Sequence, residues 1–377
     1  MTAVRGPLSI TMWDFSWLER RWPGAGYEDW DLILDELVER GYEAIRIDAY
    51  PHLLSADPEK TWELLPCWSE NTWGAQSIVH VQVLPNLVAF MRKARDRGLR
   101  IALSSWFRED RHDHRMRISS PAHLAKVWID ALRLLDEAEL LDVVWFVDLC
   151  NEFPLPFWSS FFSGSQDAPW ISRTDPSVPA YMGEAIGLVR EAYPDLSYTF
   201  SFTGEVLNWQ DQSLPGFDLI EPHIWMAGDD AGEYYEKVGY AFEKFSSAAY
   251  DNIVANARKV YLAEQAHFDQ VLFDTIDAAA AWSTSTGLPL VTTECWAIID
   301  YKDWPGLDWD WVLDLNARAV EQVLATERWM GVATSNFAGP QFRGVWREVG
   351  YHQALTAKIK ASRVAHDLSD GAGSLWT

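Results

Sequence analysis

The chain has 377 residues, of which 48% are hydrophobic and 23% are charged, a balance typical of a globular protein with a large core. Its formal net charge is −24, and a surface this acidic repels nucleic acid and anionic membranes, because both bind proteins through positive charge. We therefore predict no nucleic-acid partner and no membrane partner, and we expect a neutral ligand rather than a phosphorylated one.

The sequence begins without an apolar signal core, and no stretch is long and apolar enough to be a membrane span. The three cysteines, Cys67, Cys150 and Cys295, are too few for a disulfide framework. These features predict a reduced, cytoplasmic protein.

Short apolar runs alternate with longer amphipathic patterns along nearly the whole chain. Several of the runs are apolar without alternation, as expected for parallel strands that are covered on both faces. The predicted strands are residues 8–13, 44–50, 100–106, 143–149, 197–202, 219–225, 289–294 and 329–336. The predicted helices are residues 30–40, 81–97, 122–140, 179–193, 309–326 and 345–363, and residues 229–285 have room for two or three more.

Eight strands, each followed by a helix or a crossover, predict an α/β fold of the (β/α)8 TIM barrel type. A doubly wound sheet would more often carry a glycine-rich phosphate loop after its first strand, whereas residues 13–17 read Trp-Asp-Phe-Ser-Trp. No linker separates domains. We predict a single catalytic domain over residues 1–377 with long rim loops, a helical insertion at 226–286 after strand six, and a frayed tail at 369–377.

Polar residues gather at the predicted C-terminal ends of the strands, where the active sites of such barrels lie. Glu152 and Glu294 each follow a buried apolar run, which is a costly place for a carboxylate. Two facing carboxylates are typical of the acid/base and the nucleophile of a glycosidase. The residues that we predict to bind substrate are Trp13, Asp14, Arg46, Trp106, Asn151, His223, Trp225, Trp296 and Asn336.

Residues 148–154 (Asp-Leu-Cys-Asn-Glu-Phe-Pro) resemble the Asn-Glu-Pro motif on strand four of clan A glycoside hydrolases, with one residue inserted before the proline. Residues 292–294 (Thr-Thr-Glu) resemble the nucleophile segment on strand seven of that clan. Arg46 and His223 are similar to the strand-two arginine and the strand-six histidine of family 5 cellulase-like enzymes. The resemblance extends from the first predicted strand to the eighth.

Three positions depart from the cellulase pattern. That pattern has a histidine near the end of strand three, where residues 104–106 read Ser-Ser-Trp. It has a tyrosine two residues after the strand-six histidine, where this chain has Trp225. It also has a tryptophan at the end of strand eight, where residues 335–337 read Ser-Asn-Phe. The chain therefore resembles a divergent, cellulase-like branch of the clan.

The resemblance implies a retaining glycoside hydrolase that cleaves β-linked oligosaccharides or glycosides with two glutamates and uses neither a cofactor nor a metal. Glu152 would be the general acid/base and hold a proton near neutral pH. Glu294 would attack the anomeric carbon, with Arg46 lowering its pKa. Asn151 would donate a hydrogen bond to the sugar 2-hydroxyl, and His223 would orient a carboxylate or bind a hydroxyl.

Other interpretations remain open. A catalytically silent carbohydrate-binding barrel would explain the three departures, and a metal-dependent barrel enzyme would need histidine and aspartate ligands at several strand ends. Arg46 would in another interpretation only pair with Asp48 or another barrel carboxylate. Glu221 and Glu264 are the alternative catalytic carboxylates.

The predicted loops after strands two, four and seven are long and aromatic. Loops of this length at a barrel rim often build walls around a ligand, which predicts a pocket with exo-type cleavage rather than the open groove of an endo-acting β-glucanase. The same aromatics would also serve to pack the loops onto the barrel. They are Trp62, Trp68, Trp73, Phe157, Trp158, Phe161, Phe162, Trp170, Trp296, Tyr301 and Trp304.

Overall fold

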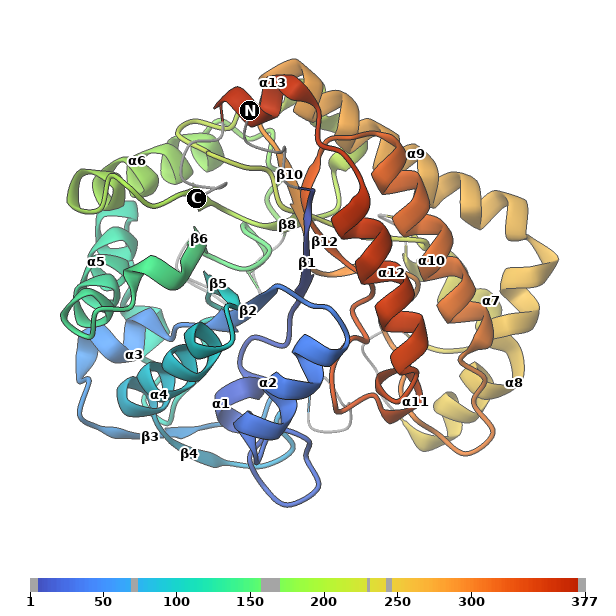
Figure 1. The fold of residues 1–377 in the computed structure, drawn as a ribbon, viewed down its shortest axis with the longest axis horizontal. Helices are drawn as coiled ribbons and strands as arrows, with labels where there is room; N and C mark the ends of the chain where they lie inside the picture. The colour runs from blue at the N-terminus through green and yellow to red at the C-terminus, as the bar shows by residue number, and fades with distance from the viewer. Residues whose placement is uncertain (1–5, 69–73, 157–169, 229–230, 242–245, 372–377) are drawn as a thin grey trace.

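The structure is a computed structural model that describes residues 6–68, 74–156, 170–228, 231–241 and 246–371. All strands except β3 (Thr61–Leu64) and β4 (Val79–Gln82) form a ring at the centre, and the helices lie outside that ring (Figure 1). One sheet has the order β10 (Leu290–Thr292), β12 (Trp329–Ala333), β1 (Leu8–Thr11), β2 (Ala44–Asp48), β5 (Arg100–Ser104), β6 (Val144–Asp148) and β7 (Tyr198–Thr199). A second sheet has the order β11 (Cys295–Trp296), β9 (Pro222–Trp225) and β8 (Phe202–Thr203).

The two sheets close into one barrel because strands five and seven are each interrupted and contribute to both. Strand five consists of β7 and β8, and strand seven consists of β10 and β11. A parallel bridge between Ile220 and Leu290 also joins strand six to strand seven. Every pairing within the ring is parallel. The predicted single-domain (β/α)8 barrel is confirmed, and each predicted strand position holds one or two strands whose bounds differ from the prediction.

Helices follow the strands and cover the outside of the barrel (Figure 1). Two predicted helix ends are marked by left-handed glycines, Gly41 with φ 83° and Gly98 with φ 71°. The Ser120 hydroxyl accepts the backbone N–H of His123 and so caps the N-terminus of the helix that follows. These helices are α1 (Ser16–Glu19), α2 (Trp30–Glu39), α4 (Val83–Asp96), α5 (Pro121–Glu137), α6 (Ser177–Ala192), α10 (Asp310–Ala325), α11 (Arg343–Trp346), α12 (Val349–Ala361) and α13 (His366–Gly371).

One segment differs in detail from the sequence analysis. Residues 345–363 are divided between α11 and α12, because Glu348 has a non-helical ψ of 60°. After β9 come three helices, α7 (Ala231–Val238), α8 (Ser247–Ala263) and α9 (Gln265–Thr286). In the predicted tail, residues 372–377 lie outside the described part of the chain. Short 3-10 turns are η1 (His114–Arg117), η2 (Leu141–Val143) and η3 (Val206–Asp211).

The loop after β2 has a structure that the sequence did not predict. It holds α3 (Pro51–Ala56) and an antiparallel pair of strands, β3 (Thr61–Leu64) and β4 (Val79–Gln82). The pair is tied to the segment after β5, since the N–H of Leu65 donates to the carbonyl of Glu109 at 2.9 Å. This segment therefore adds a structured wall next to the ends of strands two and three.

The barrel interior is tightly packed across its width. Trp145 of β6 reaches the opposite strand β12, where a Cβ placed on Gly331 would lie 2.5 Å from the Trp145 ring and 3.0 Å from a methyl of Val291. The indole therefore takes the space that a larger residue at position 331 would need.

We expect Gly331→Ala to destabilise the fold by about 1–3 kcal/mol, because the added methyl overpacks the barrel interior. Urea denaturation gives the free energy of unfolding. Gly187→Ala is the matched control, since a Cβ at this position in α6 meets nothing within 4 Å and the change should stabilise the helix by up to about 1 kcal/mol. Equal effects of the two substitutions would contradict this account of the barrel interior.

Candidate active site

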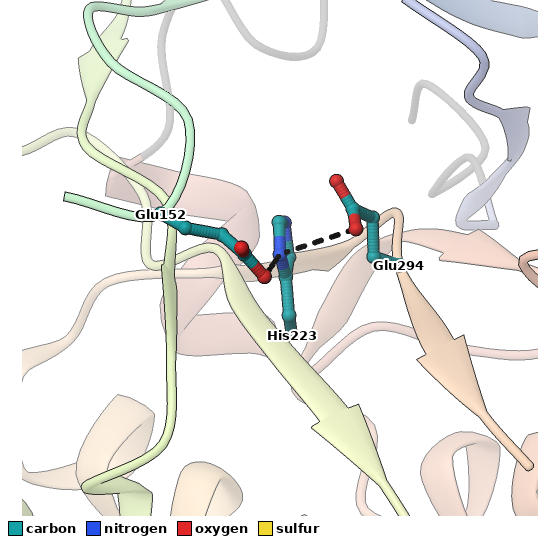
Figure 2. Close-up of side chains that lie close together, drawn as sticks. All are labelled: Glu152, His223 and Glu294. Atoms are coloured by element: carbon teal, nitrogen blue, oxygen red, sulfur yellow. Dashed lines mark hydrogen bonds and ion pairs between the residues drawn. The ribbon is translucent and has the colours of Figure 1, made fainter. Parts of the chain in front are cut away.

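Glu152 and Glu294 come from different strands of the barrel rim and meet at His223 of β9 (Figure 2). His223 Nδ1 lies 2.8 Å from Oε1 of Glu152 and 3.7 Å from Oε2 of Glu294. One carboxylate oxygen of each glutamate and a ring nitrogen of the histidine all lie within 4.8 Å of one another. The structure thus brings together both carboxylates and the histidine that the sequence singled out.

The backbone at Glu152 is held in an unusual conformation. Its φ is 51°, a left-handed value that costs a non-glycine residue free energy. Ser201 holds the turn in place: its hydroxyl accepts the N–H of Glu152 at 3.0 Å, and its carbonyl accepts the N–H of Phe153 at 2.9 Å. Strand five therefore fixes the direction in which the Glu152 side chain leaves strand four.

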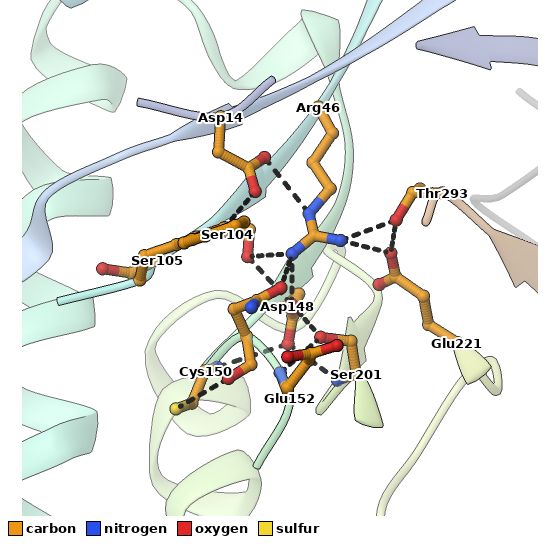
Figure 3. Close-up of polar contacts among 12 residues, drawn as sticks. Asp14, Arg46, Ser104, Ser105, Asp148, Cys150, Glu152, Ser201, Glu221 and Thr293 are labelled. Carbon is orange, nitrogen blue, oxygen red and sulfur yellow. Dashed lines mark hydrogen bonds and ion pairs between the residues drawn. The ribbon is translucent and has the colours of Figure 1, made fainter. Parts of the chain in front are cut away.

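The guanidinium of Arg46 is fully buried and lies among four carboxylates, three of which are labelled in Figure 3. Its Nε lies 3.2 Å from Asp14, and its Nη2 lies 3.5 Å from Asp148. Its Nη1 lies 3.3 Å from Glu221 and 3.6 Å from Glu294. Burial disfavours the charge of Arg46, but these carboxylates outweigh that effect and raise its pKa.

Asp48 is not among the partners of Arg46, although the sequence left that pairing open. Its carboxylate instead accepts the backbone N–H groups of Tyr50 at 2.7 Å and Trp106 at 2.9 Å. Arg46 therefore turns toward the centre of the rim and reaches Glu294, which is the contact that the resemblance implies.

Arg46 also determines which nitrogen of His223 carries a proton. Burial lowers the pKa of His223, so the ring is neutral near neutral pH. A guanidinium can only donate, so Nε2 of His223, 3.1 Å from Nη1 of Arg46, is the acceptor. The ring proton is then on Nδ1 and is donated to Oε1 of Glu152. A proton carried by Glu152 therefore belongs on Oε2.

Two buried amides at the rim have polar atoms that no described residue satisfies. Asn151 accepts a hydrogen bond from Arg46 through Oδ1, which leaves its Nδ2 without a partner. Asn336 is fully buried, and neither its Oδ1 nor its Nδ2 has a partner in the described part of the chain. A buried polar atom without a hydrogen bond costs about 1–3 kcal/mol, so these amides fit a ligand rich in hydroxyl groups.

The electrostatics of Glu294 correct one expectation from the sequence. Arg46 does act to lower the pKa of Glu294, but burial acts more strongly, and the charge of Glu152 adds to it. The net result is a pKa well above the usual range of a glutamate. Burial likewise raises the pKa of Asp14 to about 6, against the opposing effect of Arg46.

The predicted tryptophans are all largely buried at the rim. Trp106 donates its indole N–H to Asp14, so both side chains are engaged within the protein. Trp296 is fully buried and donates to the carbonyl of Ala333 at 2.9 Å, which ties strand seven to strand eight. Trp13 packs against Phe342 with ring centroids 4.9 Å apart. The remaining one, Trp225, is 6% exposed at the end of β9.

Several residues of the site were not assigned to it by the sequence analysis. They are the polar residues directly beneath the rim, Ser104, Asp148, Ser201 and Thr293, and all are fully buried. Their only sequence signal is a polar side chain within or next to an apolar strand. Glu221, which the sequence left as an alternative catalytic carboxylate, is also fully buried there. Glu264, the other alternative carboxylate, is exposed and pairs with Lys237 at 2.7 Å, away from the rim.

The rim aromatics are described only in part. Residues 69–73 and 157–169 lie outside the described residues, and with them Trp73, Phe157, Trp158, Phe161 and Phe162. Trp62 is buried and packs edge-on against His114, so it belongs to the core of its own loop. Trp68 is half-buried and packs edge-on against Trp106, and Trp170 is exposed.

Glu152, His223 and Glu294 also have the spacing of a possible metal site. An ion bound there would lie beside Arg46, whose Nη1 is 3.1 Å from the histidine ring and 3.6 Å from Glu294. It would also have to replace the hydrogen bond from His223 to Glu152. Positive charge next to the site and an occupied Nδ1 both disfavour metal binding.

The fold and the rim geometry define a (β/α)8 barrel of the glycoside hydrolase type. Residues 10–360 match the family described as sugar-binding cellulase-like, and the chain belongs to this cellulase-like family. A crystal structure of a Parabacteroides distasonis protein, provisionally described as a glycoside hydrolase, is 44% identical and has a TM-score of 0.94. The alignment covers 98% of this chain and 99% of that one.

Two more distant structures share the fold. A subfamily 18 member of glycoside hydrolase family 5 from Streptomyces cattleya, in complex with GlcNAc, has a TM-score of 0.57 at 10% identity, covering 98% of this chain and 88% of that one. A family 5 mutant enzyme from Prevotella bryantii, in complex with a xyloglucan tetradecasaccharide, has a TM-score of 0.52 at 13% identity, covering 93% and 96%. No curated protein matches the sequence. Among the described residues, no helix combines the length and apolarity of a membrane span.

Proposed function

We propose that this chain is a retaining glycoside hydrolase that cleaves β-linked oligosaccharides or glycosides. The observation that carries the proposal is the approach of Glu152 and Glu294, whose oxygens lie within 4.8 Å of each other at the barrel rim. Retaining enzymes have carboxyl groups about 5–5.5 Å apart, whereas inverting enzymes leave about 6.5–9.5 Å for a water molecule.

The reaction has two steps. Glu294 attacks the anomeric carbon, and Glu152 gives its proton to the leaving oxygen, so that a glycosyl ester forms on Glu294 and the alcohol departs. Glu152 then takes a proton from water as that water attacks the same carbon, which releases the sugar and restores both carboxyls. Arg46 lies 3.6 Å from Glu294, and His223 fixes Oε1 of Glu152, so the proton is transferred through Oε2.

The charges and amides at the site support a neutral sugar as substrate. Arg46 is surrounded by four carboxylates, so its charge is already compensated within the protein. An anionic sugar would have to approach Glu152 and Glu294 without a free cation from Arg46. Nδ2 of Asn151 and Nδ2 of Asn336 can donate hydrogen bonds to neutral hydroxyl groups, and Oδ1 of Asn336 can accept from them.

A catalytically silent carbohydrate-binding barrel is the second interpretation. Such a barrel would not need the contacts that position the side chains of Glu152 and Glu294. Glu152 is held by Ser201 and His223, and Glu294 lies 3.6 Å from Arg46. Ordering two carboxylates in a buried position is costly, so this support favours catalysis over binding alone.

Replacing Glu294 by Gln should lower kcat on the order of 10³-fold or more, because the carboxamide keeps the shape and loses the nucleophile. A 2-deoxy-2-fluoro glycoside should label the wild-type protein on the peptide that contains Glu294, as detected by mass spectrometry. The exposed Glu264→Gln is the matched control and should remain active. A Glu294→Gln variant with near wild-type turnover, or a label on another residue, would refute the assignment.

Replacing Glu152 by Ala should lower kcat/KM on the order of 10²–10⁴-fold for glycosides with poor leaving groups, because these need a proton as they depart. Activated aryl glycosides should lose much less in their glycosylation step. The measurement is kcat/KM for a series of aryl glycosides plotted against leaving-group pKa. Equal losses along the series would exclude Glu152 as the general acid.

We further propose a walled site and exo-type action. The support is the β3–β4 pair, which is fixed to the segment after β5 beside the rim. A cytoplasmic location would agree with it, because intact polysaccharides do not enter cells. On a long β-glucan, product analysis over time should show short products accumulating with little loss of viscosity. Rapid viscosity loss with fragments of intermediate size would instead show an open groove.

A further inference from the structure

Glu221 is a buried carboxyl beneath the rim that the two-step reaction leaves without a role. It directly precedes β9, has no exposed surface, and lies on the opposite side of the Arg46 guanidinium from Asp14 (Figure 3). The hydroxyl of Thr293 donates to its Oε1 at 2.7 Å, and Arg46 Nη1 lies 3.3 Å from the same oxygen. Its Oε2 is buried and has no hydrogen-bond partner among the residues that the structure describes.

One nitrogen of Arg46 is shared by more acceptors than it can serve. Nη1 carries two hydrogens, and four acceptor atoms lie within 3.6 Å of it. The oxygen of Thr293 is at 2.6 Å and Nε2 of His223 is at 3.1 Å. Oxygens of Glu221 and Glu294 are at 3.3 Å and 3.6 Å. Whichever acceptor is most negative therefore takes hydrogen bonds from the others.

The carboxylates around Arg46 cannot all be charged at once. Four buried negative charges beside one positive charge would leave a large uncompensated charge out of contact with water. Asp148 is well supported as an anion, because it accepts hydrogen bonds from Ser104 at 2.8 Å and from the hydroxyl of Ser201 at 2.7 Å. Glu221 has less support, with one hydroxyl donor and a share of Nη1. Of these two carboxyls, Glu221 is therefore the one that more readily retains a proton.

We propose that Glu221 is a positioning residue that stays protonated in the active enzyme and thereby leaves Arg46 to Glu294 and His223. Ionised Glu221 would draw Nη1 of Arg46 toward itself and so weaken the interactions of Nη1 with Glu294 and with His223. The proposal rests on the function proposed above, since it assigns Glu294 and His223 to catalysis.

The surroundings of Glu221 agree with this assignment. The titratable and charged groups that face it are Arg46 on β2, Asp148 on β6, Asp14 after β1, His223 on β9 and Glu294 after β10. Burial raises the pKa of Glu221 to about 8, against the lowering effect of Arg46. A raised pKa means that the group is neutral below about pH 8 and becomes charged above it.

The test uses the variant Glu221→Gln, which fixes the group in a neutral form and keeps an oxygen for Thr293 and Arg46. A dinitrophenyl glycoside serves as substrate, because its departure needs no proton from Glu152. Wild-type kcat/KM should fall about fivefold between pH 8 and pH 9, as for a single ionisation near pH 8. The variant should change less than about twofold over that range. The control Glu43→Gln, which alters a residue that precedes β2 and pairs with Lys360, should match the wild type.

Infrared difference spectra between wild type and Glu221→Gln provide a readout that does not depend on activity. At pH 6 the wild type should show the carbonyl band of a neutral carboxyl that the variant lacks, and the band should fade as the pH rises through about 8. The proposal is wrong if the variant keeps this carbonyl band. It is also wrong if kcat/KM of the variant falls between pH 8 and pH 9 as it does in the wild type, a fall that is called the alkaline limb. If the band is lost but no glycoside is cleaved, Glu221 is protonated while the proposed function fails.

A second variant keeps the test decisive if Glu221→Gln does not fold. Thr293→Val has nearly the same shape and removes the hydroxyl that stabilises ionised Glu221. It should move the alkaline limb of kcat/KM to higher pH. An unmoved limb, or one moved to lower pH, would overturn the proposal.

Discussion

The site depends on one buried positive charge. Arg46 extends from strand two into the centre of the rim, where it is the common partner of residues from strands one, four, six and seven (Figure 3). A buried guanidinium is stable only when its charge is compensated and its hydrogens are bonded. The surrounding carboxylates compensate that charge, and neighbouring hydroxyls accept hydrogen bonds from both Nη atoms. The same guanidinium determines the tautomer of His223 and lies 3.6 Å from Glu294.

The support for Glu152 is of another kind. Asp148, in strand four itself, accepts the hydroxyl of Ser201, and Ser201 in turn holds the backbone at Glu152 and Phe153. This chain of contacts links the Arg46 cluster to the left-handed turn at Glu152. Glu294 is thus positioned by the side chains around it, whereas Glu152 is positioned through its backbone. His223 contacts both glutamates.

The three departures from the cellulase pattern have physical counterparts. Ser104, in place of a histidine, accepts from Arg46 at 3.1 Å and donates to Asp148, so strand three helps to hold the cluster. Trp225, in place of a tyrosine, is largely buried at the end of β9. Asn336, in place of a tryptophan, presents a buried amide rather than an aromatic face. These differences leave Glu152 and Glu294 in place and add polar groups at the rim.

The sequence by itself determined the barrel, since eight apolar runs with intervening amphipathic helices leave few other ways to bury their faces. It also identified Glu152, Glu294, Arg46 and His223, because polar residues at strand ends converge in a parallel barrel. Only the tertiary structure revealed Glu221 as a partner of Arg46, and only it showed that burial outweighs Arg46 at Glu294. Both results depend on distances between residues far apart in the chain and on their shared exclusion of water, which no local pattern encodes.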